Sequence, residues 1–381
     1  MTEPPAGQER VTVGIIGGGL MGKEVAAAFA RWVALTDHPV RPELTHVCDI
    51  NPEALAWFDR IPSVVVRTAD YRDLLGPDGP DVLYVAVRHD LHEQIYLDVI
   101  EAGKSMLAEK PFGIDLPAAQ RILEAGQRHP EAFVRCSSEL PYFPGAQAAI
   151  ARAASGSLGR IIEVHSGFSH SSDFDLTKPV NWKRQAEFCG ENGVMNDLGM
   201  HVLHVPLRLG WVPDKVFAVL QDLVPERPGP DGVPVPCDTI ENATLLCTVG
   251  DDRFPLHLTT KRIDPGQKNT WTLKVLGMDG GVEFSTRYPK TLRVMTVDGG
   301  DQVWQEVEMG SQSGFGTATG GIFEFGFSDA ILQMWAAYLA ERAGALGAAF
   351  GCVTPQEAVD SHRVFAAALD SWARSEAVDL P

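Results

Sequence analysis

The sequence predicts two domains: an α/β domain with a doubly wound parallel sheet, followed by an α+β domain with a large, mainly antiparallel open sheet. Three observations support this prediction. The 381 residues exceed the length of an ordinary single domain. Short apolar runs alternate with helical segments over residues 11–139, which indicates parallel βαβ units. Over residues 140–381 many strand-like runs follow one another directly, which indicates antiparallel pairing before two closing helices.

The first domain is predicted to alternate buried strands with helices. The predicted strands are Val11–Ile16, Leu44–Cys48, Val64–Arg67, Val82–Val87, Ser105–Ala108 and Ala132–Cys136. The predicted helices are Gly22–Leu35, Pro52–Asp59, Leu91–Ala102 and Leu116–His129. Each strand is a short apolar run bounded by turn residues, which is typical of a sheet buried on both faces.

The second domain is predicted to be rich in hairpins. Asp279-Gly280-Gly281 and Asp298-Gly299-Gly300 are turn signals between strands. The proline-rich segment Val224–Pro236 is predicted to be a loop, and the chain ends in helices over Phe323–Ala343 and Pro355–Ser375. The predicted strands are Ile161–Phe168, Val216–Leu223, Ile240–Val249, Phe254–Arg262, Thr270–Leu276, Gly281–Ser285, Thr291–Val297 and Gln302–Glu308.

The composition argues against several classes of partner. The formal net charge is −18, so the surface repels nucleic-acid phosphates and anionic lipid. No apolar stretch approaches the ~20 residues that a membrane span needs. The six cysteines are scattered, which indicates reduced thiols and a cytoplasmic protein. Residues 1–10 are polar and carry no signal-peptide pattern, so we expect a disordered leader.

A glycine motif predicts a dinucleotide site. The strand Val11–Ile16 runs into Gly17-Gly18-Gly19-Leu20-Met21-Gly22, which fits GxGxxG, and an alanine-rich helix follows. Gly17 permits the tight turn, Gly19 lets a pyrophosphate approach the backbone, and Gly22 lets the helix pack close to the strand. The free N–H groups at the helix start would then face the phosphates. This context predicts a Rossmann domain rather than a plain glycine turn.

An acid follows the second predicted strand. Asp49 comes directly after Leu44–Cys48, where a carboxylate accepts from both ribose hydroxyls and repels a 2′-phosphate, so NAD is favoured over NADP. The distance from Gly22 exceeds the usual ~20 residues, and an insertion at His38–Glu43 explains the excess. The alternative is a solvated acid at a strand end.

One helix concentrates titratable side chains. If Asp197–Trp211 is helical, Asp197, His201, His204 and Arg208 share one face between apolar stripes, and Pro206 predicts a kink. Such a polar stripe lines a wet cleft or forms a satisfied core network. In the first case, Asp197 and His201 suit hydride chemistry on an alcohol, because histidine can take the released proton near neutral pH. His204 and Arg208 are either structural or contacts between subunits.

Three further segments resemble the glucose-fructose oxidoreductase / inositol dehydrogenase (Gfo/Idh/MocA) family. They are Tyr84–His92, the segment Ala102–Pro111 with its Glu-Lys-Pro signature, and Gly193–His201 with its Asp-x-x-x-His helix. Together with the glycine motif, the resemblance covers nearly the whole chain. The chain departs from the family at Val87-Arg88, where Thr-Pro is usual, and at Gly190–Gly193, where a glycine triplet is usual.

The resemblance implies an NAD(P)-dependent oxidoreductase that transfers hydride between nicotinamide and a hydroxyl or keto carbon of a sugar, inositol or related polyol. It implies that His201 is the base, assisted by Asp197, and that Lys110 donates to the reacting oxygen. Implied substrate contacts are Lys110, Trp182, Lys183, Asp197 and His201. Implied cofactor contacts are Gly17, Gly19, Leu20, Met21, Gly22, Asp49, Ile50, Val87, His92, Glu109 and Lys110. Other members act as NAD-dependent glycosidases or as non-catalytic NAD(P)-binding regulators, and both alternatives stay open.

The remaining expectations concern metals, a basic segment and assembly. His165, His170, His201 and His204 have no Cys or acid at a recognised ligand spacing, so no metal is predicted.

Lys183 or Arg184 would bond substrate hydroxyls beside Trp182, unless the segment is simply an exposed basic loop. Tyr288, Trp304 and Val307 are expected on an open face of the second sheet, which predicts a homodimer or homotetramer.

Overall fold

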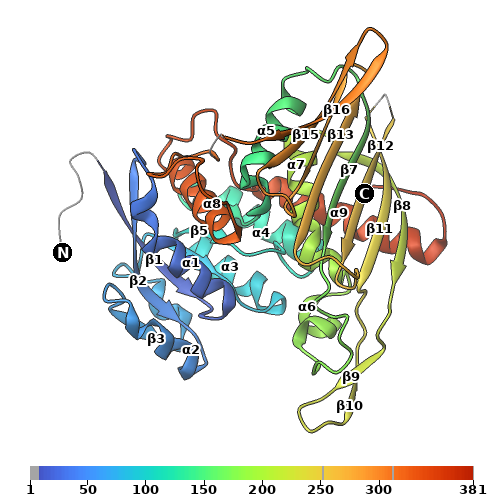
Figure 1. The fold of residues 1–381 in the computed structure, drawn as a ribbon. Coiled ribbons are helices and arrows are strands. Elements are labelled where there is room, and N and C mark those ends of the chain that lie inside the picture. Colours follow the sequence, from blue (N-terminus) through green and yellow to red (C-terminus); the bar gives the residue numbers. More distant parts are fainter. Residues whose placement is uncertain (1–7, 251–252, 311–312, 381) are drawn as a thin grey trace. The chain divides into compact units, whose positions relative to one another are not determined.

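The computed structural model describes residues 8–250, 253–310 and 313–380 (Figure 1). They form two compact units. The first comprises the described residues up to Gly113, together with Pro117–Tyr142 and Ser311–Gln356. The second comprises Ile114–Leu116, Phe143–Gly310 and Glu357–Pro381.

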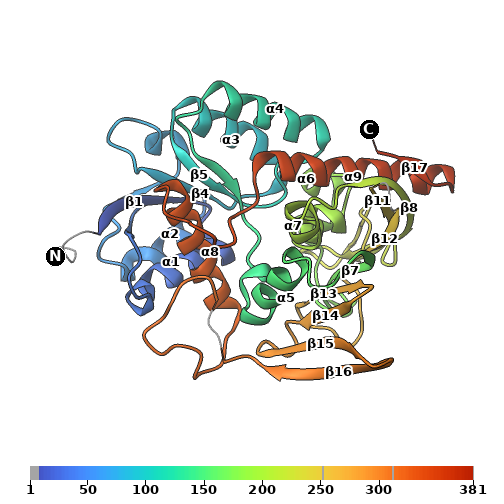
Figure 2. The same ribbon diagram turned by 90° about the horizontal axis from the view of Figure 1, so that it is seen from above.

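The first unit contains a parallel sheet in the order β3-β2-β1-β4-β5-β6, which confirms the predicted α/β class. Its strands are β1 Glu9–Ile16, β2 Val40–Cys48, β3 Val66–Thr68, β4 Val82–Val85, β5 Ser105–Ala108 and β6 Val134–Cys136. Its helices are α1 Leu20–Ala30, α2 Pro52–Trp57, α3 His92–Glu101, α4 Leu116–Arg128 and α8 Phe327–Arg342. Figure 2 shows α3 and α4 on one side of this sheet and α1 and α8 on the other.

Two expectations about the start of the chain need correction. Residues 1–7 of the expected leader lie outside the described residues, but Glu9 and Arg10 already belong to β1. The insertion His38–Glu43 does not precede the second strand but mostly belongs to it, because β2 starts at Val40 rather than at the predicted Leu44 and pairs with β1 from Glu9↔Val40 onward. The polar side chains in this segment did not indicate a strand from the sequence. The strand forms because its backbone N–H and C=O groups pair with those of β1, which does not require an apolar pattern.

Helix α8 packs in the first unit, although the sequence placed it in the second domain. Its residues Ala330–Ala340 are all buried, as expected of a helix that is covered on every side. Trp335 packs edge-on against Phe29 of α1 at 4.7 Å and against Tyr84 of β4 at 5.7 Å between ring centroids. Helix α8 therefore completes the core beside the glycine turn.

The second unit contains a nine-stranded sheet in the order β16-β15-β14-β13-β7-β12-β11-β8-β17. The pair β7·β12 is parallel and the others are antiparallel, so the sheet is mainly antiparallel as predicted. The strands are β7 Ile161–Ser169, β8 Pro213–Gln221, β11 Asn242–Val249, β12 Phe254–Lys261, β13 Thr270–Gly277, β14 Gly280–Ser285, β15 Thr291–Asp298, β16 Asp301–Glu308 and β17 Val378–Asp379. The helices are α5 Pro144–Ala154, α6 Ala186–Cys189, α7 Met200–Arg208 and α9 Pro355–Arg374.

One face of this sheet is covered and the other is open. Along β7, Val164, Ser166 and Phe168 are buried, whereas Glu163 and His165 are half-buried. On the covered face, Phe284 of β14 lies 6.3 Å from the ring of Phe143, at the start of α5. We call the opposite side, which carries Glu163 and His165, the open face.

The loop prediction for Val224–Pro236 is wrong, because the segment forms a small hairpin. Strands β9 Glu226–Pro228 and β10 Pro234–Pro236 pair antiparallel, with Pro228 opposite Pro234. Proline cannot donate to a ladder, but it is tolerated at the edge positions of a two-stranded ribbon. Gly232, with φ of +80°, makes the turn between the strands.

The expected set of aromatic and apolar residues on the open face is partly wrong. Trp304 lies on that face, since the Arg293 guanidinium is 5.0 Å from its ring. Val307 pairs with the buried Leu292 and therefore lies on the opposite face. The cause is strand alternation, which places residues three apart on opposite faces. Tyr288 lies between β14 and β15 and is 61% exposed.

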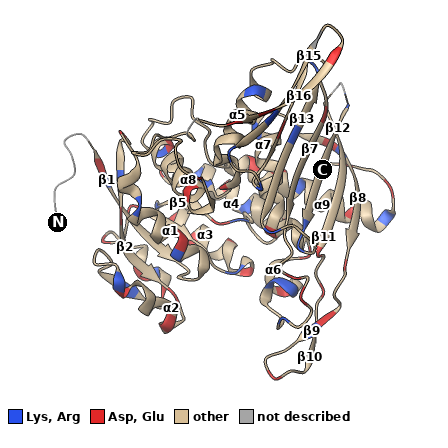
Figure 3. Ribbon diagram, in the orientation of Figure 1, with Lys and Arg blue, Asp and Glu red and all other residues tan. Residues whose placement is uncertain are grey.

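Three general features of the chain are its cysteines, the distribution of its charged residues and the length of its helices. All six cysteines are buried free thiols. Acidic and basic side chains are interspersed over the elements of both units (Figure 3). Within the described residues, every helix is too short or too polar to cross a lipid bilayer.

Candidate active site

The glycine turn of the first unit has the geometry of a phosphate cradle. Gly17 has φ of +103°, and a Cβ there would lie 2.3 Å from the Ala86 carbonyl oxygen. A Cβ at Gly22 would lie 2.3 Å from the Gly17 carbonyl oxygen, so both glycines are required by the backbone itself. A Cβ at Gly19 would meet nothing within 4 Å of it among the described residues. The space in front of Gly19 is therefore open to a ligand.

The start of α1 suits a pyrophosphate. Gly19 is the N-cap, it provides no side-chain cap, and the described first turn carries no acidic residue. The N–H groups of that turn can therefore donate to an anion, which the helix dipole also favours. Leu20 is 79% exposed and Met21 is half-buried, so both predicted contacts lie at the surface of this turn. The residues fit the dinucleotide that the motif predicts.

Asp49 is fixed against the same turn rather than left in solvent. Its Oδ2 accepts from the Gly18 N–H at 2.7 Å, and its Oδ1 accepts from the Asn51 N–H at 2.8 Å. Ile50, beside it, is 86% exposed. A carboxylate held at the end of the second strand suits ribose hydroxyls and disfavours a 2′-phosphate.

The Glu109-Lys110-Pro111 segment follows β5 at the carboxyl edge of the parallel sheet. Glu109 is buried, and its Oε1 accepts from the Tyr84 hydroxyl at 2.6 Å and from the Ser137 hydroxyl at 2.7 Å. Lys110 is half-buried. Ligands of doubly wound folds bind at this edge, where Lys110 lies shortly after the end of β5.

His92 belongs to the framework of this edge. The fully buried ring has Nδ1 2.7 Å from the Pro111 carbonyl oxygen and Nε2 3.1 Å from the Val87 carbonyl oxygen. Burial lowers the pKa of His92, so a neutral ring donates to one carbonyl at a time. His92 thus joins the loop after β4 to the turn that carries Lys110, and any effect on the cofactor passes through those backbones.

A second buried acid lies near this segment and was not predicted from the sequence. Glu139 is 5% exposed. Burial, followed by the charge of Glu109, raises the pKa of Glu139 to about 7. The ordinary pKa of a glutamate is 4.5. Between pH 4.5 and 7, Glu139 is therefore protonated in the folded protein and ionised in the unfolded chain.

This shift predicts a pH-dependent difference between the wild type and Glu139→Gln. The free energy of unfolding of the wild type should fall as pH rises from about 4.5 to 7, because the unfolded chain binds fewer protons there. Glutamine resembles the protonated carboxyl, so E139Q should match the wild type at pH 4.5 and exceed it by about 2–3 kcal/mol at pH 8. Urea unfolding at a series of pH values measures this, with the exposed Glu101→Gln as control. Parallel pH curves for E139Q and the wild type would contradict it.

In the second unit, the predicted site helix begins with a π-helical turn. Met195–Gly199 is π-helical and continues as α7, which ends at Arg208 rather than at the predicted Trp211. The Asn196 amide anchors the turn by donating to the Ile114 and Cys189 carbonyls, each at 2.8 Å. Single π turns within helices occur frequently at functional sites. The sequence pattern could not reveal this one, since a π turn is defined by its backbone hydrogen bonds rather than by a spacing of apolar residues.

Asp197 is the centre of a charged cluster. Its Oδ1 accepts from Lys183 Nζ at 2.8 Å, and its Oδ2 accepts from Arg262 Nε at 3.2 Å. Asp197 is 7% exposed and Arg262 1%, whereas the Lys183 side chain is 34% exposed. Two cations hold the carboxylate ionised in a buried position, and Lys183 keeps access to solvent.

Arg262 is a site residue that sequence reasoning missed. Its guanidinium also donates to the Lys183 carbonyl at 3.1 Å and to the Gly193 carbonyl at 3.4 Å. Arg262 directly follows β12, 65 residues after Asp197. A charged residue after an alternating strand normally reaches solvent, so only the fold reveals the pairing.

His201 follows one turn after Asp197. It is 2% exposed, and its ring packs edge-on against Phe168 at 5.1 Å between centroids. The indole N–H of Trp271 donates to the His201 carbonyl at 2.8 Å. Asp197 in the π-helical turn and His201 in α7 therefore lie one turn apart on the continuous helix that the sequence predicts.

Other residues of the predicted face have structural roles. Arg208 forms a two-pronged ion pair with Glu357 of α9, with Nε and Nη2 donating at 2.6 and 2.9 Å. His204 is fully buried.

The basic segment Trp182–Arg184 divides between two roles. Arg184, which was predicted as a possible substrate ligand, is 3% exposed and paired with Asp173. Burial, followed by the charge of Arg262, lowers the pKa of Arg184 to about 10. Of the basic segment, Lys183 reaches Asp197, and its Nζ lies 5.6 Å from the half-buried Trp182 ring.

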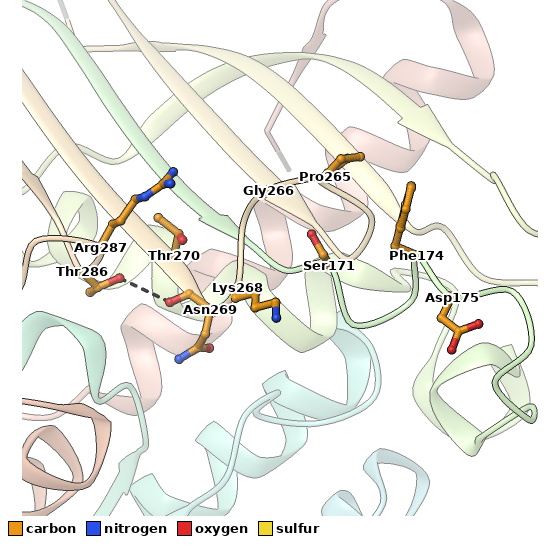
Figure 4. A pocket seen from close by; sticks show the side chains of 10 residues that line it. All are labelled: Ser171, Phe174, Asp175, Pro265, Gly266, Lys268, Asn269, Thr270, Thr286 and Arg287. Atoms are coloured by element: carbon orange, nitrogen blue, oxygen red, sulfur yellow. Dashed lines mark hydrogen bonds between the residues drawn. The ribbon is translucent and has the colours of Figure 1, made fainter.

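A hollow of about 510 Å³ lies elsewhere in the second unit, around the loops after β7 and β12 (Figure 4). Its lining is mainly apolar, with polar side chains such as Lys268, Asn269 and Arg287 at its border, and the Thr286 hydroxyl donates to the Asn269 carbonyl at 3.3 Å. None of the predicted site residues lines this hollow.

Taken together, a glycine turn with an acid at the second strand, and a helix pairing an ionised aspartate with a histidine, define a dinucleotide-dependent oxidoreductase. Comparison with known proteins is consistent with this class. Residues 11–135 match the oxidoreductase family with an NAD-binding Rossmann fold, and residues 146–283 match the GFO/IDH/MocA C-terminal domain. The chain belongs to the Gfo/Idh/MocA family of oxidoreductases.

Individual relatives are distant. Levoglucosan dehydrogenase of Pseudarthrobacter phenanthrenivorans is 26% identical over 310 residues, covering 75% of this chain and 76% of that protein. Inositol 2-dehydrogenase of Salmonella typhimurium is 25% identical over 160 residues, and the match spans 46% of its length and 42% of this chain. The solved structure of levoglucosan dehydrogenase with NADH and levoglucosan has a TM-score of 0.86 at 22% identity, covering 98% of this chain and 100% of that one. The likeness of these structures establishes a shared fold.

Proposed function

We propose that this chain is an NAD-dependent dehydrogenase or reductase that acts on a hydroxyl or keto carbon of a sugar, inositol or related polyol. The observation that carries the proposal is the buried Asp197 carboxylate, fixed by Lys183 and Arg262 on the helix that also carries His201. Such a cluster offers fixed donors and acceptors to vicinal hydroxyl groups. The relatives named above act on levoglucosan and inositol, which supports this substrate class.

The chain's residues divide the work between hydride and proton transfer. NAD, when bound, accepts or supplies the hydride. His201 takes the hydroxyl proton during oxidation and returns it during reduction, because imidazole exchanges protons near neutral pH. Asp197 accepts from a substrate hydroxyl and orients it. Lys110 of the first unit would donate to the reacting oxygen and stabilise the negative charge that develops on it.

The cofactor contacts are part of the proposal. The turn Gly17–Gly22 would hold the pyrophosphate, Asp49 the adenosine ribose, and the exposed Ile50 the adenine. Val87 would approach the nicotinamide ribose. His92 and Glu109 would position Lys110 through the buried contacts described above.

A panel of sugars, inositols and keto-sugars, assayed with NAD(H) and NADP(H) in parallel by NADH absorbance, tests the function. We expect reversible oxidation of at least one polyol, with a kcat/KM at least ten-fold higher for NAD than for NADP. Substrate cleavage without net redox change would indicate the glycosidase chemistry known in the family. Dinucleotide binding without turnover of any compound would indicate a regulator.

Glycine substitutions test the cofactor cradle. Gly22→Ala should lower the free energy of unfolding by about 2–3 kcal/mol, because its Cβ would lie 2.3 Å from a backbone oxygen. Gly19→Ala should leave stability within about 1 kcal/mol and weaken NADH binding by about ten-fold, because its Cβ would fill the open space before the turn. Fluorescence titration and urea unfolding separate the two effects. Equal NADH affinity in G19A and the wild type would refute the cradle.

We also propose a cytoplasmic homodimer or homotetramer that associates through the open face of the second sheet. That face carries Phe217, Val219 and Leu246, each about two-fifths or more exposed, and this apolar surface would be covered in an assembly. The buried free thiols suit a reducing compartment. A monomeric mass by light scattering at micromolar concentration would contradict the assembly.

A further inference from the structure

Three potential metal ligands converge on the open face, far along the chain from Asp197 and Lys110. They are Glu163 and His165 of β7 and His257 of β12. The ligand atoms of the three side chains all lie within 4.8 Å of one another. His165 Nε2 is 2.7 Å from Glu163 Oε1, and His257 Nε2 is 3.2 Å from the same oxygen.

The sheet itself brings these side chains together. Glu163 and His165 are two residues apart on β7, so strand alternation places them on the same face. His257 lies directly opposite His165 in the parallel pair β7·β12. The two imidazoles stack with centroids 4.3 Å apart and an interplanar angle of 5°, so at least one ring has to turn about its Cβ–Cγ bond for both lone pairs to meet one ion. Ligands on adjacent strands in the interior of a sheet are held more firmly than ligands on loops.

The donor set and its spacing suit a borderline divalent cation. Two ligands of a tetrahedral zinc ion at ~2.0–2.1 Å are separated by roughly 3.3 Å. The contact of His257 with Glu163 Oε1 at 3.2 Å has this spacing, whereas the contact of His165 at 2.7 Å has hydrogen-bond length and would lengthen around an ion. Two imidazoles with one carboxylate form a familiar set of three protein ligands, which leaves a fourth position for water. The side chains are 34–41% exposed in the single chain, so an ion can enter before subunits associate through this face, and in the proposed assembly it would lie at the subunit contact.

The electrostatic surroundings act in both directions. Lys274 of β13 lies opposite His165 and opposes a cation. Glu283 of β14 lies opposite Lys274 and offsets part of that charge, and it also accepts from Arg293 at 2.8 Å.

We propose that Glu163, His165 and His257 form a zinc site on the open face of the second sheet. The site is separate from the oxidoreductase chemistry, which uses no metal in the proposed function. A zinc ion there would link β7 to β12 and stabilise the folded state in proportion to its occupancy. The set differs from the four histidines weighed from the sequence, because Glu163 and His257 are brought to His165 only by strand pairing.

Cobalt titration of the full-length protein after chelator treatment tests the site. We expect one Co²⁺ per chain, with the intense visible absorption of four-coordinate cobalt, without a thiolate charge-transfer band, and displaceable by Zn²⁺. His257→Gln and Glu163→Gln should each weaken binding by about 100-fold or more, since each removes a ligand. Two variants are used so that a folding failure in one leaves the other informative.

His129→Gln is the matched control. His129 also pairs with a glutamate, with Nδ1 3.1 Å from Glu131 Oε1, but it lies outside the convergent cluster. H129Q should bind Co²⁺ as the wild type does. The proposal is overturned if the wild type binds no stoichiometric Co²⁺, or if E163Q and H257Q bind it with unchanged affinity.

Discussion

Lys110→Met is expected to lower kcat/KM by about 10²–10³-fold while NADH still binds. The loss follows from removing one donor aimed at an oxygen on which charge develops. Lys110 follows β5 at the ligand-binding edge of the sheet, and the flanking Glu109 is anchored by Tyr84 and Ser137. The glycine turn and Asp49 are unchanged in this variant. Steady-state kinetics and fluorescence titration with NADH therefore separate chemistry from cofactor binding.

Lys104→Met is the control for this experiment. Lys104 directly precedes β5, whereas Lys110 follows it, and its ammonium donates to the Gly79 carbonyl at 3.3 Å at the other end of the strand. K104M removes an equal charge from the other end of β5, away from the ligand-binding edge of the sheet. The kcat/KM should therefore stay within about two-fold of the wild type. Retention of more than a tenth of the wild-type kcat/KM in K110M would show that Lys110 does not assist the reaction.

The first unit was predictable because its strands are buried on both faces. Continuous apolar runs such as Val82–Val85 and Ser105–Ala108 are unambiguous when helices separate them, and GxGxxG fixes the order of the first strand and helix. Asp49 could be located by counting to the end of the second strand. Its contact with the Gly18 N–H is a consequence of that topology.

The failures have a common cause in tertiary contacts. Helix α8 was assigned to the second domain by chain position, yet its uniformly buried surface packs against Phe29 and Tyr84. The pairing of β9 with β10 overrode the local preference of proline for loops. Arg262 meets Asp197 because the end of β12 packs against the π-helical turn, and His257 meets His165 because β12 pairs with β7. Periodicity reports which residues are buried, but not which distant residue satisfies a buried charge.

Asp197→Asn is expected to lose both activity and stability. Removing the carboxylate leaves the Arg262 guanidinium, 1% exposed, without its charged partner. Loss of one member of a buried ion pair typically costs 3–5 kcal/mol, and the remaining bonds of Arg262 to two carbonyls favour the lower end, about 3 kcal/mol. The kcat/KM should fall by about 10²-fold or more, because the substrate loses an orienting acceptor. Urea unfolding and steady-state kinetics measure the two losses separately.

The double variant Asp197→Asn/Arg262→Met separates a structural role of Asp197 from a role in catalysis. Replacing the unpaired guanidinium with an apolar side chain should recover most of the lost stability, since breaking a buried pair costs more than removing it whole. Activity should remain low, because the acceptor for the substrate is still absent. The exposed pair Asp370–Arg374 gives the control, and D370N should change stability by less than about 0.5 kcal/mol. If the double variant regained activity together with stability, Asp197 would serve only to neutralise Arg262, and the substrate would have to be oriented by other groups.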